Sequence, residues 1–309
     1  MIIIRNNFNK IKGNLSLAIG NFDGVHKGHK FILSKLRNYK KTSNDKIGVL
    51  TFSPHPVKII KPKEWKKNLI RFRTKFYLLK KEKIDYLLNI RFDLNMSQLP
   101  AETFIEKYLI GLLKVKNILV GEDFRFGKNR EGNISLLNDY HNLGKFNLKF
   151  LKKIGVEKPF SSSMARKYLL SGNIEKTNYI LGYNWEVTGK VVRGKAKGRE
   201  LGFPTANIEY LYQIAPSNGI YACLVKVGND KKWQMAAIST GTRPQYKGEE
   251  KILEAHILDF TGNLYEKRLK VAFVKKIRNE EVFDSEEGLI KQMQADCTLI
   301  RKFLINYKR

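Results

Sequence analysis

Hydrophobic and polar positions follow two different periodic patterns along the chain. Up to about residue 155, short apolar runs alternate with longer segments of helical periodicity, and we predict the apolar runs as strands. Strands are expected at 15–19, 47–52, 86–90, 118–120 and 148–151, and helices at 30–39, 74–83, 101–113 and 134–142. Strict alternation of strand and helix favours an α/β domain whose parallel sheet is covered on both faces.

From residue 185 onward the pattern is typical of antiparallel β-structure. Strands are expected at 185–192, 220–227, 233–238, 251–258 and 269–275, separated by turns rich in Gly and Asn. This pattern favours a small β-barrel. The tail from Ser285 has apolar residues three and four apart, which predicts a terminal helix packed against its own barrel.

A short helical segment is expected between the two halves. Ser161–Ser163 and Asn173 are candidate caps of two short helices, and Gly182 is placed to end the second. We therefore predict two domains, at residues 1–183 including this helical linker and at residues 184–309.

The length and composition fit such a globular protein. The chain has 309 residues, of which 42% are hydrophobic, enough for two domains with their own cores. No apolar run approaches the roughly 20 residues of a membrane span, and Met1–Ile4 is too short for the core of a signal peptide. We expect a cytoplasmic protein without a membrane partner. Cys223 and Cys297 are too few for a disulfide framework, although one bridge between them stays open.

The charge is strongly positive and widely spread. Lys and Arg number 58 against 29 Asp and Glu, for a formal net charge of +29. Such a charge suits polyanionic small substrates and also nucleic acid. Because lysines are spread along the whole chain, we interpret most of the charge as a solvated surface and expect no nucleic-acid partner.

The segment Gly20–His29, directly after the first strand of this pattern, is the strongest candidate site. Gly20 and Gly24 would tighten a turn, and His26 and His29 would lie three residues apart at the positive end of a helix. Unpaired backbone N–H groups and two imidazoles at this helix end favour binding of nucleotide phosphates. The candidate nucleotide-binding residues in this segment are Gly20, Phe22, Asp23 and Gly24.

A second group follows the fourth predicted strand. Asp123 and Arg125 should lie near the same sheet edge as the histidines, because ligands of parallel sheets bind at the carboxyl ends of the strands. Phe124 and Phe126 are candidates to offer a ring face to a base or an isoalloxazine. An ordinary strand end with a charge pair is the alternative.

The serine triplet precedes a cation in the first turn of a predicted helix. Arg166 there is opposed by the helix dipole, and a bound phosphate would remove that penalty. Ser162, Ser163 and Arg166 are therefore candidate nucleotide-binding residues. A plain helix cap with the arginine directed to solvent is the alternative.

The third group lies in the β-rich half, at residues 194–207. Thr205 and Asn207 are two residues apart, so an extended chain puts both on one side, and their oxygens suit Mg²⁺ shared with phosphate. The candidate nucleotide-binding residues here are Gly194, Lys197, Gly198, Arg199, Gly202 and Pro204. Glu254 alternates with apolar neighbours and is a candidate base directed into the barrel mouth, with a surface glutamate as the alternative.

Taken in order, these motifs resemble those of the bacterial bifunctional riboflavin kinases and FAD synthetases over nearly the whole chain. They are G-x-F-D-G-x-H-x-G-H from residue 20, F-x-P-H-P from 52, G-E-D-F-R-F-G from 121, S-S-S-x-x-R from 161, G-R-x-L-G-F-P-T-A-N from 198, G-T-R-P from 241 and L-E-A-H-I-L-D-F from 253. The P-T-A-N sequence behind G-R-x-L-G-F is the most specific of them.

The resemblance implies two activities that use ATP. A Rossmann-like nucleotidyltransferase domain would join FMN to the adenylyl group of ATP, releasing pyrophosphate and forming FAD, and the barrel would phosphorylate riboflavin to FMN with Mg²⁺. The implied roles are triphosphate stabilisation by His26 and His29, an adenylyl site at Asp123, phosphate contacts from Ser162, Ser163 and Arg166, Mg²⁺ near Thr205 and Asn207, and a carboxylate base at Glu254. The expected partners are small-molecule substrates, and flavoprotein clients stay open.

The chain departs in two places from the residues that are common in this family. Ser163-Met164-Ala165 stands where Thr followed by a basic and a branched residue is common, and Ser239-Thr240 stands where Asn-Ile is common. The first departure leaves open a riboflavin kinase with an impaired adenylyltransferase half. A basic RNA-binding protein is the alternative outside enzymes.

Overall fold

The computed structural model describes the chain except for residues 6, 157, 195–196, 211–212, 243–250 and 308–309. It divides into two compact units, Met1–Ser161 and Ser162–Arg309. Arg243 and Pro244 of the G-T-R-P motif lie outside the described residues, as does the side chain of Lys197.

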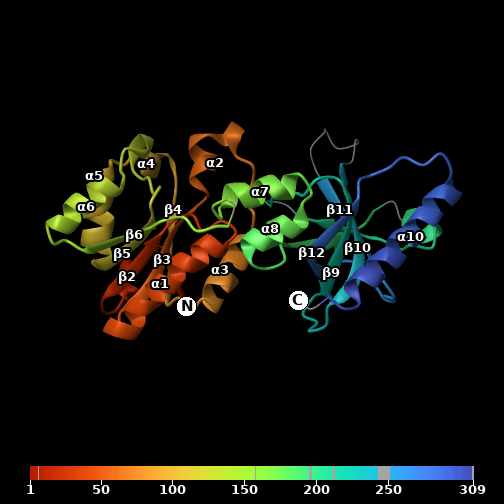
Figure 1. Cartoon of the computed structure of the whole chain (residues 1–309), viewed down its shortest axis with the longest axis horizontal. Coiled ribbons are helices and arrows are strands. Elements are labelled where there is room, and N and C mark those ends of the chain that lie inside the picture. Colours follow the sequence, from red (N-terminus) through yellow and green to blue (C-terminus); the bar gives the residue numbers. More distant parts are fainter. Residues whose placement is uncertain (6, 157, 195–196, 211–212, 243–250, 308–309) are drawn as a thin grey trace. The chain divides into compact units, whose positions relative to one another are not determined.

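The first unit is built on a six-stranded parallel sheet of order β1-β4-β3-β2-β5-β6 (Figure 1). Its strands are β1 (Ile2–Ile4), β2 (Leu15–Ile19), β3 (Lys46–Ser53), β4 (Tyr86–Arg91), β5 (Val115–Gly121) and β6 (Asn147–Leu151). Its helices are η1 (Phe8–Lys10), α1 (Lys27–Ser43), α2 (Pro56–Ile60), η2 (Pro62–Glu64), α3 (Phe72–Lys81), α4 (Leu94–Ser97), α5 (Ala101–Thr103), η3 (Phe104–Leu112), η4 (Lys128–Arg130) and α6 (Ile134–Asn142). The predicted α/β class with a parallel sheet is confirmed.

Besides several short helices that were not predicted, one strand and one helix of this unit differ from the expected elements. The three-residue strand β1 pairs with β4 and was not predicted, because so short an apolar run carries no periodicity. The expected helix at 101–113 starts as α5 and continues as the π-helix η3, which ends with a hydrogen bond from the Leu113 N–H to the Tyr108 carbonyl.

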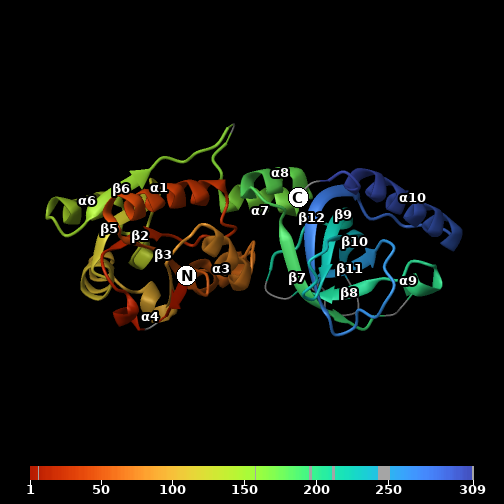
Figure 2. The same cartoon turned by 90° about the horizontal axis from the view of Figure 1, so that it is seen from below.

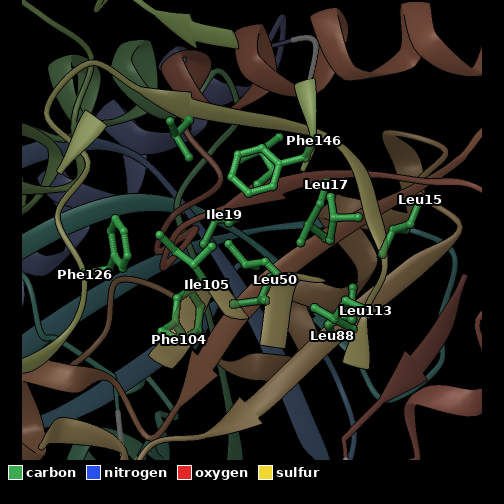
Figure 3. Close-up of a cluster of buried hydrophobic side chains, with 14 of the residues drawn as sticks. Leu15, Leu17, Ile19, Leu50, Leu88, Phe104, Ile105, Leu113, Phe126 and Phe146 are labelled. Atoms are coloured by element: carbon green, nitrogen blue, oxygen red, sulfur yellow. The ribbon is translucent and has the colours of Figure 1, made fainter. Parts of the chain in front are cut away.

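The core of the first unit lies between one face of the sheet and η3. Figure 3 shows Leu17 and Ile19 of β2 and Leu50 of β3 among Phe104 and Ile105 of this helix, and all five are buried. The opposite face of β2 and β3 is packed by α1. With both faces covered, the carboxyl ends of the strands are left as the place for a site.

The second unit contains a closed barrel of order β10-β11-β8-β7-β12-β9, with antiparallel neighbours (Figure 2). Its elements are α7 (Ser162–Leu170), α8 (Ile174–Leu181), β7 (Glu186–Val192), α9 (Lys197–Glu200), β8 (Ala206–Glu209), β9 (Gly219–Val227), β10 (Gln234–Thr242), β11 (Lys251–Ile257), β12 (Arg268–Arg278) and α10 (Glu286–Leu304). The predicted small antiparallel barrel with a terminal helix is confirmed. The short strand β8 was missed.

The terminal helix α10 covers part of the outer face of the barrel. Ser285 caps it through the Gly288 N–H, and Ile300 and Leu304 pack on outward side chains of β9 and β12 such as Leu224 and Val274. Figure 1 shows α10 next to β10. The predicted packing of the tail on its own barrel is therefore confirmed.

The two cysteines are not bonded to one another. Cys223 is buried on β9 and Cys297 is half-buried on α10, and both are free thiols. The alternative of a single disulfide bridge is thereby excluded.

The helices α7 and α8 belong to the second unit by their contacts, whereas the expected boundary placed them in the first domain. Asn178 of α8 donates from Nδ2 to the Phe273 carbonyl of β12 at 2.9 Å and accepts the Trp185 N–H at 2.8 Å. These bonds join the helix to the barrel. A division of function at residues 183 and 184 stays a prediction.

This packing predicts a difference between two fragments. A fragment of residues 162–309 should unfold at a higher temperature than one of residues 184–309, because the shorter fragment lacks Asn178 and the buried side chains of Ile174, Ile180 and Leu181. Burial of one such side chain contributes about 1.5–3 kcal/mol. Thermal unfolding followed by circular dichroism measures the difference, and equal midpoints would contradict this role of α8.

Candidate active sites

The turn between β2 and α1 adopts a backbone that most residues avoid. Gly24 has a φ of +83°, and two non-glycine residues of the turn, Phe22 and Val25, have φ values of +47° and +37°. Such conformations cost on the order of 1–3 kcal/mol each and persist only where the surrounding structure enforces them. Gly24 therefore satisfies the predicted need for glycine, whereas Gly20 has no positive φ.

The two histidines of this turn lie face to face at the start of α1. His26 is the N-cap residue, and its Nδ1 accepts the backbone N–H of His29 at 3.3 Å. The two rings are stacked with centroids 3.6 Å apart, and the ring of Phe22 lies 4.7 Å from that of His29. The structure thus brings both imidazoles together at the positive end of the helix, as the sequence predicted.

Burial sets the protonation state of these two rings. Burial lowers the pKa of His26 to about 4, and burial together with the charges of His26 and Lys75 lowers the pKa of His29 well below its ordinary value. Both rings are therefore neutral at pH 7. Because His26 Nδ1 accepts a hydrogen bond, its proton is assigned to Nε2, from which it can donate to a phosphate oxygen.

His29 also carries an unmet hydrogen-bonding requirement. Its Nδ1 is buried and has no hydrogen-bond partner within the described part of the chain. A buried polar atom without a partner is costly, and a bound ligand is one way to satisfy it. This observation supports a ligand site at the stacked imidazoles.

Asp23 has a second role besides its predicted place in the nucleotide loop. Both of its carboxylate oxygens accept the Leu69 N–H at 3.0 Å, and one also accepts the Ile70 N–H at 3.4 Å. The carboxylate is buried and holds a segment 46 residues away against the turn. Contact between Asp23 and a nucleotide stays a prediction.

Asp123 lies two residues beyond the carboxyl end of β5. Because β5 pairs with β2 in the sheet, Asp123 follows the strand next to the one that leads to the histidines. Its side chain is 64% exposed and accepts from Lys153 Nζ at 2.8 Å. The rings of Phe124 and Phe126 stack at 5.4 Å, and Phe126 packs into the core against Phe104. Phe126 is therefore mainly a core residue. Of the two rings, only the half-buried Phe124 stays a candidate for contact with a flavin or base.

The serine segment lies on α7, which belongs to the second unit. Ser162 and Arg166 are half-buried, and Ser163 is exposed. Their expected contact with nucleotide phosphates stays a prediction.

In the second unit, the strand register aligns the candidate base with one of the candidate metal ligands. Glu254 on β11 lies directly opposite Asn207 on β8 and opposite Ser239 on β10. Its neighbours Leu253 and Ala255 are buried inside the barrel, so Glu254 points to the outer face. The expected projection into the barrel mouth is wrong, because alternation along a strand does not tell which face another element will cover.

Glu254 lines a cavity of about 490 Å³ on this outer face. Thr205 and Gly198 line it beside Glu254, and Leu289 and Met293 of α10 supply an apolar side. The volume lies within the roughly 300–1,000 Å³ of small-molecule sites. The cavity therefore combines a carboxylate and a hydroxyl with an apolar surface of the kind that a ring system requires.

One wall of this cavity contains an ion pair between the half-buried Arg278 and the buried Asp296, which the sequence did not reveal. Arg278, at the end of β12, donates from Nε at 3.1 Å and from Nη2 at 2.9 Å to the Asp296 carboxylate on α10. Gln292 donates to the same carboxylate at 3.0 Å. The pair joins the barrel to the helix beside Glu254. Residues 278 and 296 belong to no motif from which this ion pair could have been predicted.

Two glycines of the 194–207 segment allow close approach to the candidate metal ligands. A Cβ at Gly194 would overlap the Asn207 amide, and a Cβ at Gly198 would lie 2.5 Å from the Phe203 carbonyl and 3.2 Å from Thr205 Oγ1. The remaining candidates, Arg199, Gly202 and Pro204, lie in the same short helix and turn, and Gly202 has a φ of +83°. Close packing against Asn207 and against Phe203 and Thr205 accounts for Gly194 and Gly198, and the positive φ accounts for Gly202.

A substitution tests this close packing. Gly194→Ala is expected to lower the riboflavin phosphorylation that the resemblance implies at least about 10-fold, since the new methyl group must displace the Asn207 side chain and a shift of about 1 Å near the reacting groups can cost 10²-fold. The initial rate of FMN formation measures this effect. Gly228→Ala has open space around its Cβ but a positive φ of 54°, so it controls for general backbone strain. Equal rates for native and Gly194→Ala proteins would contradict the prediction.

No transmembrane candidate and no acidic or thiolate metal cluster occurs in the part of the chain that the structure describes. Its helices include none long and apolar enough to cross a membrane. Its His, Cys, Asp and Glu side chains form no group of three able to hold a metal ion. A metal at Thr205 and Asn207 would therefore depend on neutral oxygen donors and on a phosphate ligand.

Both halves of the chain match known protein families. The chain matches the family model described as FAD synthetase over residues 8–165 and that described as riboflavin kinase over residues 181–304. It is 37% identical to a protein named bifunctional riboflavin kinase/FMN adenylyltransferase from Buchnera aphidicola subsp. Schizaphis graminum, over 96% of each chain. A protein of the same name from Escherichia coli strain K12 is 36% identical over 93% of this chain and 92% of its own.

A solved structure is similar over its whole length. The crystal structure titled as a macrolide-efflux protein from Streptococcus pneumoniae is 27% identical, covers 100% of both chains and has a TM-score of 0.88.

An α/β unit that matches the FAD synthetase model and a closed barrel that matches the riboflavin kinase model define a two-domain transferase. The chain belongs to the family of bifunctional riboflavin kinases/FMN adenylyltransferases, and it contains both the FAD synthetase and the riboflavin kinase domain.

Proposed function

We propose that this chain converts riboflavin to FMN in the outer cavity of the barrel and FMN to FAD at the turn before α1. The observation that supports the proposal is that candidate phosphate-handling residues gather at two places, one in each unit. The stacked imidazoles of His26 and His29 form the first, and Thr205, Asn207 and Glu254 form the second.

In the barrel, Glu254 acts as the general base. Its carboxylate takes the proton of the terminal ribityl hydroxyl of riboflavin, and the hydroxyl oxygen then attacks the γ-phosphorus of ATP while ADP leaves. The Thr205 hydroxyl and the Asn207 amide carbonyl are the residues that would hold Mg²⁺, which neutralises phosphate charge when it is bound. Leu289 and Met293 offer the apolar surface for the isoalloxazine.

At the turn before α1, the reaction needs positioning and charge stabilisation more than covalent help. A phosphate oxygen of FMN attacks the α-phosphorus of ATP, and pyrophosphate leaves. Neutral His26 and His29 donate hydrogen bonds to phosphate oxygens that gain charge in the transition state, beside the N–H groups of the α1 N-terminus. Asp123 belongs to this proposed set. Phosphate contacts from Ser162, Ser163 and Arg166, which lie on α7 of the second unit, stay a separate prediction.

One assay tests both activities. Purified protein is incubated with riboflavin, ATP and Mg²⁺, and riboflavin, FMN and FAD are separated by chromatography. FMN followed by FAD is expected. FMN without FAD would favour the kinase with an impaired adenylyltransferase half, and the absence of both products would refute the proposal.

Since both reactions consume ATP, we also propose a cytoplasmic location, with proteins that take up FMN or FAD as recipients of the products.

A further inference from the structure

A lysine far away in the sequence contacts the turn that carries the imidazoles. Lys75, on α3, donates from Nζ to the Asn21 carbonyl at 2.7 Å and to the Thr51 hydroxyl at 3.3 Å. The Thr51 hydroxyl in turn donates to the same Asn21 carbonyl at 3.0 Å. These three hydrogen bonds form a closed triangle that joins the end of β2, the strand β3 and the helix α3.

The triangle fixes the first peptide group of the strained turn. Because a peptide is planar and trans, fixing the Asn21 carbonyl toward α3 also fixes the N–H of Phe22 in the opposite direction. Phe22 is the first residue of the turn with a positive φ, and Val25 is another. Such a backbone persists only where its surroundings determine it, and the Lys75 contact acts at its start while the Asp23 contact with Leu69 acts at its middle.

Lys75 also brings a positive charge close to the imidazoles. Burial lowers the pKa of Lys75 to about 8, while the nearby Asp23 carboxylate favours the charged form. The ammonium is therefore mostly charged at pH 7. Its charge disfavours protonation of His29, which helps to keep that ring neutral.

The nearest charged groups do not duplicate this role. Asp23 is engaged by backbone N–H groups, and His26 and His29 are neutral at pH 7. Among these neighbours, Lys75 supplies the positive charge and a hydrogen bond to the Asn21 carbonyl.

We infer that Lys75 is a positioning residue for adenylyl transfer, which holds the Asn21 peptide and thereby the strained turn in the geometry that presents His26 and His29 to the phosphates of ATP. The inference rests on the proposed FMN adenylyltransferase activity of this site. Riboflavin phosphorylation takes place in the other unit, so it serves as an internal control for the same polypeptide.

The first test replaces Lys75 by methionine, which keeps the length of the side chain but removes the ammonium. FMN adenylylation is expected to fall at least about 10-fold, in line with the sensitivity of such reactions to small misplacements. Riboflavin phosphorylation should stay within two-fold of native. Lys80→Met, an exposed change on the same helix, is the matched control and should leave both rates unchanged.

A second variant separates positioning from general stability. Lys75→Ala leaves space for a small cation, so added ethylammonium should restore several-fold of the lost FAD formation, which loss of folded protein would not allow. Lys75→Met fills that space and should gain nothing from ethylammonium.

The possible outcomes are distinct. If the native protein forms no FAD, the proposed adenylyltransferase activity itself fails. If the native protein forms FAD and Lys75→Met does so within two-fold of native, or if ethylammonium restores nothing to Lys75→Ala, the positioning role is refuted. Loss in Lys75→Met, with native-like kinase activity and rescue of Lys75→Ala, supports it.

Discussion

Replacing Glu254 by glutamine is expected to lower riboflavin phosphorylation about 10²- to 10⁴-fold, the range typical of a lost general base. Glutamine keeps the shape of the side chain in the cavity but cannot take the proton of the ribityl hydroxyl. The position of Glu254, opposite Asn207 and in the same cavity as Thr205, puts it beside the proposed phosphate site. Rates of FMN formation from riboflavin, at saturating ATP and Mg²⁺, measure the effect.

The Glu254 variant has two controls. Glu209→Gln changes an exposed glutamate on the neighbouring strand β8 and should leave the kinase unaffected. Adenylylation of added FMN should also proceed normally in Glu254→Gln, because that reaction uses the other unit. Near-native FMN formation by Glu254→Gln would refute the assignment of the base.

Replacing His29 by alanine is expected to lower FMN adenylylation about 10²- to 10³-fold, as for loss of one preorganised hydrogen-bond donor in an active site. His26→Ala should have an effect of similar size and also cost about 1 kcal/mol of stability, since His26 caps α1. The kinase activity of both variants should be unchanged. FAD formation from FMN and ATP, followed by chromatography, measures the loss.

The pH dependence provides a further check on the histidines. The pKa of His26 is about 4 and that of His29 is well below its ordinary value, so both rings stay neutral from pH 7 down to pH 6. The adenylyltransferase kcat/KM should therefore show no imidazole ionisation in this interval.

His141→Ala, on α6 of the same unit, is the matched control for the two histidine variants and should retain activity. Native-like rates for His29→Ala, or a loss of equal size in His141→Ala, would contradict the proposed role.

The architecture was largely predictable from the chain. The alternation of strands and helices predicted the parallel sheet, and the change of rhythm near residue 185 predicted the barrel. The strands β1 and β8 were missed because three or four residues are too few to show a period, and they are defined by pairing, β1 with the distant β4, and β8 with the preceding strand β7 and the distant β11. Tertiary pairing, which local pattern does not encode, supplied what was missing.

The sites were predictable where motif residues follow one another along the chain. The turn Gly20–His29 and the segment that contains Thr205 carried their own signals. Lys75 did not, because its partner Asn21 lies 54 residues away and a lysine at a helical position usually belongs to a solvated face. The lowered pKa of the imidazoles was equally hidden, since it results from burial by the folded chain.

The central claim is that two ATP-dependent reactions take place at two independent sites of one polypeptide. Mixing Glu254→Gln protein with His29→Ala protein, in the presence of riboflavin, ATP and Mg²⁺, tests it most directly. Neither variant alone should form appreciable FAD, and the mixture should form it, because FMN made by the His29 variant is adenylylated by the Glu254 variant. A mixture that forms no FAD, although the first variant adenylylates added FMN and the second phosphorylates riboflavin, would contradict the account.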